Sequence, residues 1–321
     1  MPILLLQACP SQHTPHCESV KKRTRNTVVG LLIIGLLATI AAIVILVMYP
    51  REITTWYTRG GLERAGLTKY VHDHDRGHIT YYRGGDGPPL VFVHGLADQA
   101  GSWHQIAAEF VDDFDVIVVD LPSHGESPYR RDEEVLGDEA TEILRHFFDE
   151  LDDAPLTMVG NSLGGWVILE YALSRPDSVA HLVPVGSAGL EHDIDPSLLM
   201  PSDRTEARRT IRMIFGDDPP PTPGFVLDQI VERSGESIVS TALEQSDDAQ
   251  YLDDRLGDVN VPVDLVWGTE DLIFPVDYAR QMNRGIPDSE LHIIDGCGHS
   301  PQVGCPDEFT DVLRELLADA P

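Results

Sequence analysis

The stretch from residue 156 to residue 173 constrains the fold more than any other part of this chain. Leu156–Val159 is a short apolar run typical of a buried strand, and Trp166–Leu173 has the composition and length of a helix. Between them lies the pattern G-x-S-x-G, with Ser162 at its centre. Glycines two residues to either side permit a turn so sharp that larger side chains would clash with the strand and the helix. We therefore predict that Ser162 projects from a strand-to-helix turn, close to a helix N-terminus that favours negative charge.

Strands and helices alternate along the rest of the chain. A hairpin over residues 69–72 and 78–82 is predicted to supply antiparallel strands at the edge of the sheet. Alternation of strands and helices predicts right-handed crossovers and a mostly parallel sheet flanked by helices, so we expect one α/β domain over residues 68–321. The other predicted strands lie at 90–93, 116–119, 180–185, 263–267 and 291–294, and the other predicted helices at 102–110, 134–151, from 276, and at 309–318.

A serine, an aspartate and a histidine follow the ends of three predicted strands. The carboxyl ends of parallel strands meet at one rim of a sheet, so Ser162, Asp271 and His299 are expected to meet there. A serine hydroxyl needs a base to take its proton, and imidazole titrates in a suitable range. A carboxylate must hold that imidazole in one tautomer. We predict Ser162 as nucleophile, His299 as base and Asp271 as the carboxylate, with the adjacent Glu270 as the alternative carboxylate.

The same chemistry needs hydrogen-bond donors for a negatively charged tetrahedral oxygen. The backbone N–H of Leu163 directly follows the serine, and the backbone N–H of Leu96 follows another strand end. We predict that these two groups form the oxyanion hole. The residues predicted to support the two loops are His94, Gly95, Gly160 and Gly164.

Several further histidines, acidic residues and cysteines suggest other roles. The hairpin residues His72, Asp73, His74, Asp75 and His78 could converge on a metal ion, but they are predicted to lie at the sheet edge, away from the serine, and we predict no metal site. His124 is interpreted as a turn residue. The four cysteines show no metal-ligand spacing. Cys297 and Cys305 could pair in an oxidising compartment or remain free thiols.

An uncharged, mostly apolar run extends from Val28 to Tyr49, long enough to cross a hydrocarbon core of about 30 Å as a helix. We predict a transmembrane helix over 27–49, a poorly ordered cytoplasmic tail over 1–26, and a juxtamembrane connector over 50–67 with Trp56 and Tyr57 at the membrane interface. Basic residues crowd the N-terminal flank of the run. The positive-inside rule therefore favours a single-pass protein with a cytoplasmic N-terminus and an extracytoplasmic catalytic domain, with the reverse orientation as the alternative.

The overall charge excludes one class of partner. The formal net charge is −30, and Lys69 is the one lysine beyond residue 22. Nucleic-acid binding requires lysines and arginines to neutralise phosphates, so no nucleic-acid partner is expected. The acidity is typical of a solvated surface suited to high salt, where screening relieves self-repulsion.

Taken together, five motifs resemble those of the α/β-hydrolase superfamily over residues 90–318. The order Ser, Asp, His along the chain also agrees with that fold. The resemblance implies an eight-stranded sheet, a helical cap inserted at about 188–259, and neither a metal nor an organic cofactor. Within the superfamily the chain looks like the membrane-anchored monoacylglycerol-lipase and carboxylesterase branch, although Ser123 stands where a glycine is commoner. The motifs are Val91-Phe92-Val93-His94-Gly95, Asp120-Leu121-Pro122-Ser123-His124-Gly125-Glu126-Ser127, Gly160-Asn161-Ser162-Leu163-Gly164-Gly165, Trp267-Gly268-Thr269-Glu270-Asp271 and Gly298-His299-Ser300-Pro301.

The resemblance and the residues lead to one expected function and two alternatives. We expect a serine hydrolase that cleaves carboxylic esters, with a monoacylglycerol or another lipid-like ester as substrate and an acyl-enzyme intermediate. A hydrolase of the same fold that cleaves the carbon–carbon bond of ring-cleavage products uses the same triad, so the sequence does not separate the two. A non-catalytic binding protein is the third possibility, and the complete triad argues against it. The expected partners are the ester substrate and the bilayer around residues 27–49.

Overall fold

The computed structural model describes residue 35 and residues 50–75, 77–127, 137–151, 154–234, 238–244 and 251–318. The predicted tail over 1–26 and, apart from Gly35, the predicted transmembrane helix over 27–49 lie outside these residues. Within the described ranges, no helix combines the length and the apolar character needed to cross a membrane. The chain divides into two units, Met1–Ile53 and Thr54–Pro321, and the second contains the sheet with its flanking helices.

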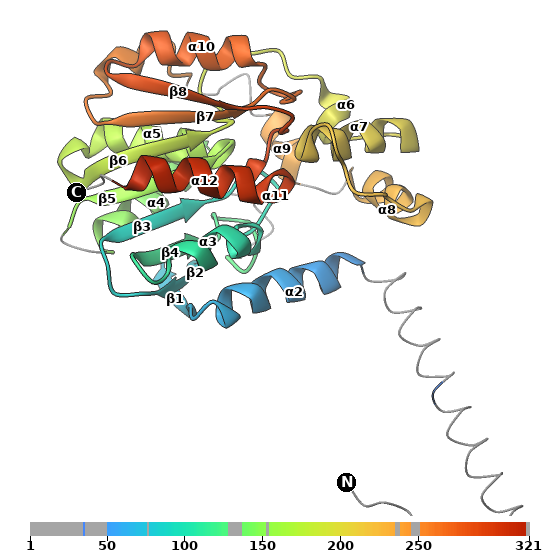
Figure 1. Ribbon diagram of the computed structural model, residues 1–321, viewed down its shortest axis with the longest axis horizontal. Coiled ribbons are helices and arrows are strands. Elements are labelled where there is room, and N and C mark those ends of the chain that lie inside the picture. The colour runs from blue at the N-terminus through green and yellow to red at the C-terminus, as the bar shows by residue number, and fades with distance from the viewer. Residues whose placement is uncertain are drawn as a thin grey trace, which may run out of the picture. The chain divides into compact units, whose positions relative to one another are not determined.

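Eight strands form one sheet in the order β1-β2-β4-β3-β5-β6-β7-β8 (Figure 1). The pairs β1–β2 and β2–β4 are antiparallel, and every other neighbouring pair is parallel. The prediction of an eight-stranded, mostly parallel sheet with an antiparallel hairpin is therefore confirmed. The strands are β1 (Thr68–His74), β2 (Gly77–Gly84), β3 (Pro89–Val93), β4 (Asp115–Val119), β5 (Leu156–Asn161), β6 (Val179–Val185), β7 (Val263–Gly268) and β8 (Ser289–Ile294).

The strand order places the predicted site at a switch point of the sheet. From β3 the chain moves to β4 on one side, and it then returns to β5 on the other side of β3. The chain leaving β3 and the chain leaving β5 therefore continue to opposite sides of β3, and in open α/β sheets ligands bind at such a switch point. The loop after β3 carries Leu96, and the turn after β5 carries Ser162.

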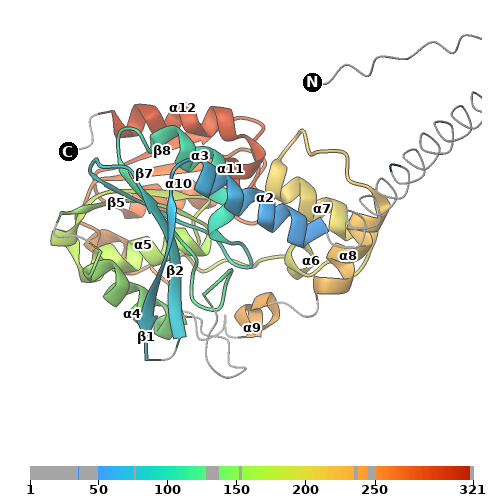
Figure 2. The same ribbon diagram turned by 90° about the horizontal axis from the view of Figure 1, so that it is seen from below.

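Helices cover both faces of the sheet (Figures 1 and 2). The central strands are buried on both faces because of this, and all five residues of β3 are buried. One core cluster joins the sheet to α4 (Gly137–Asp149), α5 (Leu163–Ser174) and α10 (Val276–Gly285). The other joins it to α3 (His104–Phe110) and α12 (Pro306–Leu317). The remaining short elements are η1 (Ala100–Trp103), η2 (Pro176–Ser178) and α11 (Pro301–Gly304).

A helical insertion separates β6 from β7, in the region where the cap is expected. Its helices gather on the side of the molecule to which the carboxyl ends of the strands point (Figure 1). The insertion packs on the loop after β8, because His299 N–H donates to the carbonyl of Met213 at 2.7 Å and Asp217 N–H donates to the carbonyl of Gly296 at 2.9 Å. Its elements are α6 (Pro196–Leu199), α7 (Arg204–Phe215), α8 (Gly224–Ser234), α9 (Ile238–Glu244) and η4 (Leu256–Asp258).

The segment predicted as a connector over 50–67 contains a helix, α2 (Pro50–Arg64). Leu62, in its last turn, is fully buried in the core cluster that holds α3 and α12. Trp56 is 73% exposed on the same helix. The C-terminal part of α2 is therefore an integral part of the domain as well as a link to the preceding residues.

Candidate active site

Ser162 occupies the turn between β5 and α5 in an unusual backbone conformation, with φ 57° and ψ −117°. Such conformations cost about 1–3 kcal/mol and persist only where surrounding structure fixes them. Ser162 N–H donates to the carbonyl of Val185 at 2.9 Å, and the Ser162 carbonyl accepts from Gly165 N–H at 3.0 Å and Trp166 N–H at 3.2 Å. The residue is half-buried, so the turn leaves part of it accessible to solvent.

Two glycines make this turn possible, as the G-x-S-x-G pattern predicts. A Cβ at position 160 would lie 2.4 Å from the carbonyl oxygen of Gly164. A Cβ at position 164 would lie 2.4 Å from the carbonyl oxygen of Val93. Either contact is far shorter than van der Waals distance. Gly160 and Gly164 therefore let β5, the helix start and the end of β3 approach each other directly.

His299 and Asp271 meet from the loops after β8 and β7. The Nδ1 atom of His299 lies 2.8 Å from Oδ2 of Asp271, and both side chains are buried. The other carboxylate oxygen of Asp271 accepts the backbone N–H of Ile273 at 2.8 Å and of Phe274 at 2.9 Å. The carboxylate is thus fixed by its own loop, and Nδ1 of His299 is the donor to it. This tautomer leaves the lone pair of a neutral ring on Nε2.

Glu270, the alternative carboxylate, points elsewhere. Its Oε2 atom lies 2.9 Å from the guanidinium of Arg212 on α7. The pair joins the cap to the loop after β7 and is largely exposed on the arginine side. The structure therefore brings Asp271 to His299 and engages Glu270 in a contact with the cap.

The loop after β3 approaches the serine as predicted. A Cβ at Gly95 would lie 3.1 Å from Cβ of Ser162, so the glycine allows the loop to lie against the turn. His94 is fully buried beneath it. Its Nε2 atom accepts the backbone N–H of Leu121 at 3.0 Å, and Nδ1 then donates to the carbonyl of Gly95 at 2.7 Å. Burial lowers the pKa of His94 to about 4, so the ring is neutral and holds the Leu96 loop through both nitrogens.

A family model described as the alpha/beta hydrolase family matches residues 90–312. The chain belongs to this family. An uncharacterized protein of Mycobacterium tuberculosis is 27% identical over 271 residues, which cover 73% of this chain and 76% of that protein. Monoacylglycerol lipase ABHD6 of Homo sapiens is 22% identical over 318 residues, which cover 90% of this chain and 93% of that protein. A crystal structure described as a membrane phospholipase A superposes with a TM-score of 0.74 at 22% identity, covering 92% of this chain and 99% of that one. The prediction of an α/β-hydrolase enzyme is confirmed.

The side chain of Asn161 joins the turn at Ser162 to the loop that contains His299, a role that is not apparent from the sequence. Its side-chain amide donates to the carbonyls of Val185 at 3.0 Å and His299 at 2.9 Å. Its Oδ1 atom accepts from Gln302 Nε2 at 3.0 Å. Because Asn161 directly precedes Ser162, these bonds place the backbone of His299 beside the turn. The available signal in the sequence was an asparagine at the end of an otherwise apolar predicted strand.

Asp120, in the motif over residues 120–127, supports the loop after β3 that carries Leu96. Asp120 is fully buried and accepts the N–H of Ala100 at 2.7 Å and of Glu126 at 2.8 Å. Arg59 of α2 reaches both carboxylates, at 3.6 Å from Asp120 and 3.1 Å from Glu126. Burial raises the pKa of Asp120, which the two N–H donors and the arginine partly offset. No sequence pattern indicates that Arg59 takes part in this support.

The remaining predicted residues have structural partners. Ser123, where a glycine is commoner in the family, has φ 63°, a conformation that glycine adopts without strain. His124 contacts the carbonyl of Pro122 at 2.8 Å through Nδ1, as expected of a turn residue. In the hairpin, His78 contacts the carbonyl of Glu126 at 3.1 Å. Among the described residues, the groups that could hold a metal ion do not include the hairpin set.

Cys297 and Cys305 form a disulfide with a Cα–Cα distance of 5.9 Å. From the sequence alone, these two cysteines could either pair or remain free thiols. The bridge closes a short loop that contains His299, and Cys297 is fully buried. The histidine loop is thus fixed by a covalent bridge at its ends, by Asn161 at the carbonyl of His299, and by the cap through Met213.

Proposed function

We propose that this hydrolase cleaves carboxylic esters with Ser162 as nucleophile, His299 as general base and Asp271 as the carboxylate that orients it. The 2.8 Å hydrogen bond between His299 and Asp271 carries the proposal. It leaves Nε2 of His299 able to accept the serine proton. Within the described residues the Ser162 hydroxyl makes no side-chain hydrogen bond, so the bond between Ser162 and His299 is itself part of the proposal.

The proposed reaction has two steps. Oγ of Ser162 attacks the ester carbonyl while its proton passes to Nε2 of His299, and the oxyanion accepts hydrogen bonds from the backbone N–H groups of Leu96 and Leu163. The imidazolium then protonates the leaving alcohol as the C–O bond breaks, which gives an acyl-enzyme. Water attacks the acyl group with His299 again as base. The acid leaves, and the serine recovers its proton.

We propose a lipid-like substrate, such as a monoacylglycerol, for three reasons. One relative is named a monoacylglycerol lipase, and the superposed structure is described as a membrane phospholipase. The apolar run over 27–49 fits a membrane anchor. Trp56 on α2 is exposed and suits the headgroup region of a bilayer. A protein held in this way would meet substrates that partition into the membrane.

The proposed orientation places the catalytic domain outside the cytoplasm. The basic flank before residue 27 favours a cytoplasmic N-terminus. The disulfide between Cys297 and Cys305 is consistent with this, because disulfides persist in oxidising compartments. Protease protection in intact cells tests the orientation, and a C-terminal domain that resists external protease until lysis would refute it.

The nucleophile is tested with a fluorophosphonate probe, which labels activated serines. The wild-type protein in detergent should be labelled and should hydrolyse p-nitrophenyl esters. Ser162→Ala should abolish labelling and lower turnover by about 10⁴-fold or more. Ser187→Ala is the matched control, because Ser187 is a buried serine near the turn whose hydroxyl donates to the carbonyl of Ala188. Labelling that survives in Ser162→Ala would refute the assignment.

The substrate class needs a separate measurement. Rates on p-nitrophenyl esters of increasing acyl length, and on monoacylglycerols in mixed micelles, should rise with chain length. Equal turnover of short soluble esters and long-chain monoacylglycerols would contradict the lipid proposal. Cleavage of ring-cleavage products without ester hydrolysis would contradict the ester proposal and favour carbon–carbon hydrolysis.

A further inference from the structure

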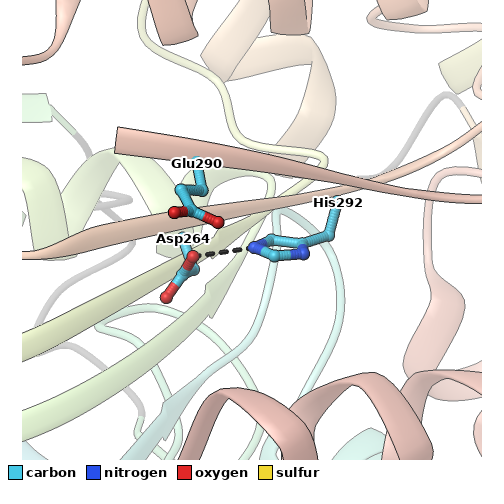
Figure 3. Close-up of side chains that lie close together, drawn as sticks. All are labelled: Asp264, Glu290 and His292. Carbon is cyan, nitrogen blue, oxygen red and sulfur yellow. Dashed lines mark hydrogen bonds and ion pairs between the residues drawn. The ribbon is translucent and has the colours of Figure 1, made fainter. Parts of the chain in front are cut away.

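A second group of potential ligands lies at the opposite end of the sheet from His299. Asp264 is the second residue of β7, and Glu290 and His292 lie near the start of the edge strand β8 (Figure 3). Asp264 is directly opposite Glu290 in the parallel register. His292 is two residues further along β8, so its side chain is on the same face as that of Glu290. One ligand atom from each residue lies within 4.8 Å of the others.

The carboxylate of Asp264 is held by two imidazoles. Its Oδ1 atom lies 2.7 Å from Nε2 of His292, and its Oδ2 atom lies 2.8 Å from Nε2 of His181 on β6. The side chain of His181 is 8% exposed and that of Asp264 is 19% exposed. These two hydrogen bonds orient the carboxylate of Asp264 from both of its oxygens.

The carboxylates of Asp264 and Glu290 lie close together, and no arginine or lysine of the described residues pairs with either. Other acidic side chains of the domain form such ion pairs, for example Asp115 with Arg83 and Glu170 with Arg255. The two negatively charged carboxylates repel each other when they lie this close, and a cation bound between them would attract both.

We propose that Asp264, Glu290 and His292 bind one divalent first-row transition-metal ion, with Zn²⁺ as the reference ion. An imidazole and two carboxylates suit Zn²⁺ and its neighbours better than Mg²⁺ or Ca²⁺, which prefer oxygen ligands alone. Oδ1 of Asp264 and Nε2 of His292 are the two ligand atoms that already lie next to each other, 2.7 Å apart. Glu290 is exposed and has the side-chain freedom to close on the ion. His181 keeps its hydrogen bond to Oδ2, which is how carboxylate ligands are usually oriented.

On metal binding, the proton on Nε2 of His292 would be replaced by the metal ion. Nε2 of His292 now donates to Asp264, and it must present its lone pair to the metal. A doubly protonated ring releases the Nε2 proton to solvent, and a neutral ring takes a proton at Nδ1 as it loses the one at Nε2. The ion would join the edge strand β8, which pairs with β7 alone in the sheet, to its neighbour. The site is separate from the proposed chemistry of Ser162 and does not depend on it.

The test is equilibrium dialysis of the chelator-treated full-length protein against ZnCl₂, with metal content measured by mass spectrometry. We expect one Zn²⁺ per chain, no comparable uptake of Mg²⁺, and a Zn²⁺-dependent rise in Tm. Glu290→Gln and His292→Ala should each weaken Zn²⁺ binding by at least tenfold and remove the rise in Tm. Glu290→Gln preserves size at an exposed position, so the test does not depend on a variant that fails to fold.

Two matched controls distinguish this site from others. His146→Ala removes an exposed histidine that also contacts a glutamate, Glu142 at 3.1 Å, and should leave Zn²⁺ binding unchanged. His299→Ala removes the ring of the proposed triad and should also leave it unchanged. Unchanged affinity in both Glu290→Gln and His292→Ala would overturn the proposal. So would loss of the bound ion in His299→Ala, because the ion would then belong to the active site.

Discussion

At the scale of single residues, the orientation of the His299 ring depends on how Asp271 uses its two oxygens. One oxygen accepts two backbone N–H groups, and the other accepts the proton on Nδ1. The backbone bonds hold the carboxylate in place whether or not it is charged. The charge and the acceptor character of Oδ2 are therefore what select the tautomer of His299.

Asp271→Asn should separate these two roles. The asparagine oxygen can still accept from Ile273 and Phe274, but its NH₂ group would face Nδ1 and stabilise the tautomer with a proton on Nε2. That ring cannot take the serine proton, so kcat should fall by about 10⁴-fold with little change in Tm. Glu270→Gln is the matched control and should change kcat by no more than a few fold, because its partner Arg212 is 53% exposed. A larger loss in Glu270→Gln than in Asp271→Asn would reverse the assignment.

His94 gives the hydrolase a stability that depends on pH. Burial lowers its pKa from 6.5 to about 4, so between these values the unfolded chain binds more protons than the folded one. The contribution of His94 to the free energy of unfolding is fully present above pH 6.5. As the pH falls from 6.5 towards 4, about 3 kcal/mol of it is lost. In the same loop, burial raises the pKa of Asp98 to about 6. Between pH 4 and 6 the folded chain therefore binds more protons at Asp98 than the unfolded chain does, so this residue makes the free energy of unfolding rise as the pH falls.

The effect of His94 is isolated by comparison with His94→Gln. Urea unfolding from pH 7 to pH 4 should show the free energy of unfolding falling more steeply in the wild type than in the variant. The contribution of Asp98 is common to both proteins and cancels in the difference. Parallel pH curves for the two proteins would show that His94 does not titrate in this range.

At the scale of elements, the histidine loop is fixed by several independent contacts. The disulfide joins Cys297 and Cys305 across a sequence separation of 8, so it spans the loop from the end of β8 to the start of α12. Asn161 holds the His299 carbonyl from β5, and α7 of the cap accepts the His299 N–H. Movement of this loop would therefore require several bonds to break together.

Removal of the bridge should weaken both stability and catalysis. A closed loop of this length contributes about 2–3 kcal/mol through the entropy of the unfolded chain. The double variant Cys297→Ala, Cys305→Ala should unfold at a lower urea concentration and should show lower kcat, because the position of His299 is less restricted. The double variant Cys9→Ala, Cys17→Ala replaces two cysteines that lie outside this loop in the sequence and should match the wild type. Equal stability of the two double variants would contradict a structural role for the bridge.

At the scale of the whole domain, the hydrolase consists of a sheet with an apolar core and helices on each face, and a helical cap at one end. The central strands were predictable because burial on both faces makes them continuous apolar runs. All eight predicted strands are present. The segment before the first strand was less predictable, because its contacts with the domain include single residues of a largely polar helix, the buried Leu62 and the half-buried Arg59.

The residues of the candidate site were also predictable in part. Ser162, Asp271 and His299 could be proposed as a triad because their chemistry is distinctive and each follows a strand end. Asn161, Arg59 and the His181–Asp264–His292 chain could not, since their partners lie far away in the sequence. Such contacts depend on strand order and register, and single-residue patterns contain neither.

By itself, the sequence determined the alternation of strands and helices, the sharp turn at Ser162 and the set of chemically capable side chains, because local propensity and periodicity are properties of short segments. Only the tertiary structure brings Asp271 rather than Glu270 to His299, pairs Cys297 with Cys305, and places two carboxylates side by side at the sheet edge. These outcomes depend on distances between segments that the chain brings together only when the sheet forms.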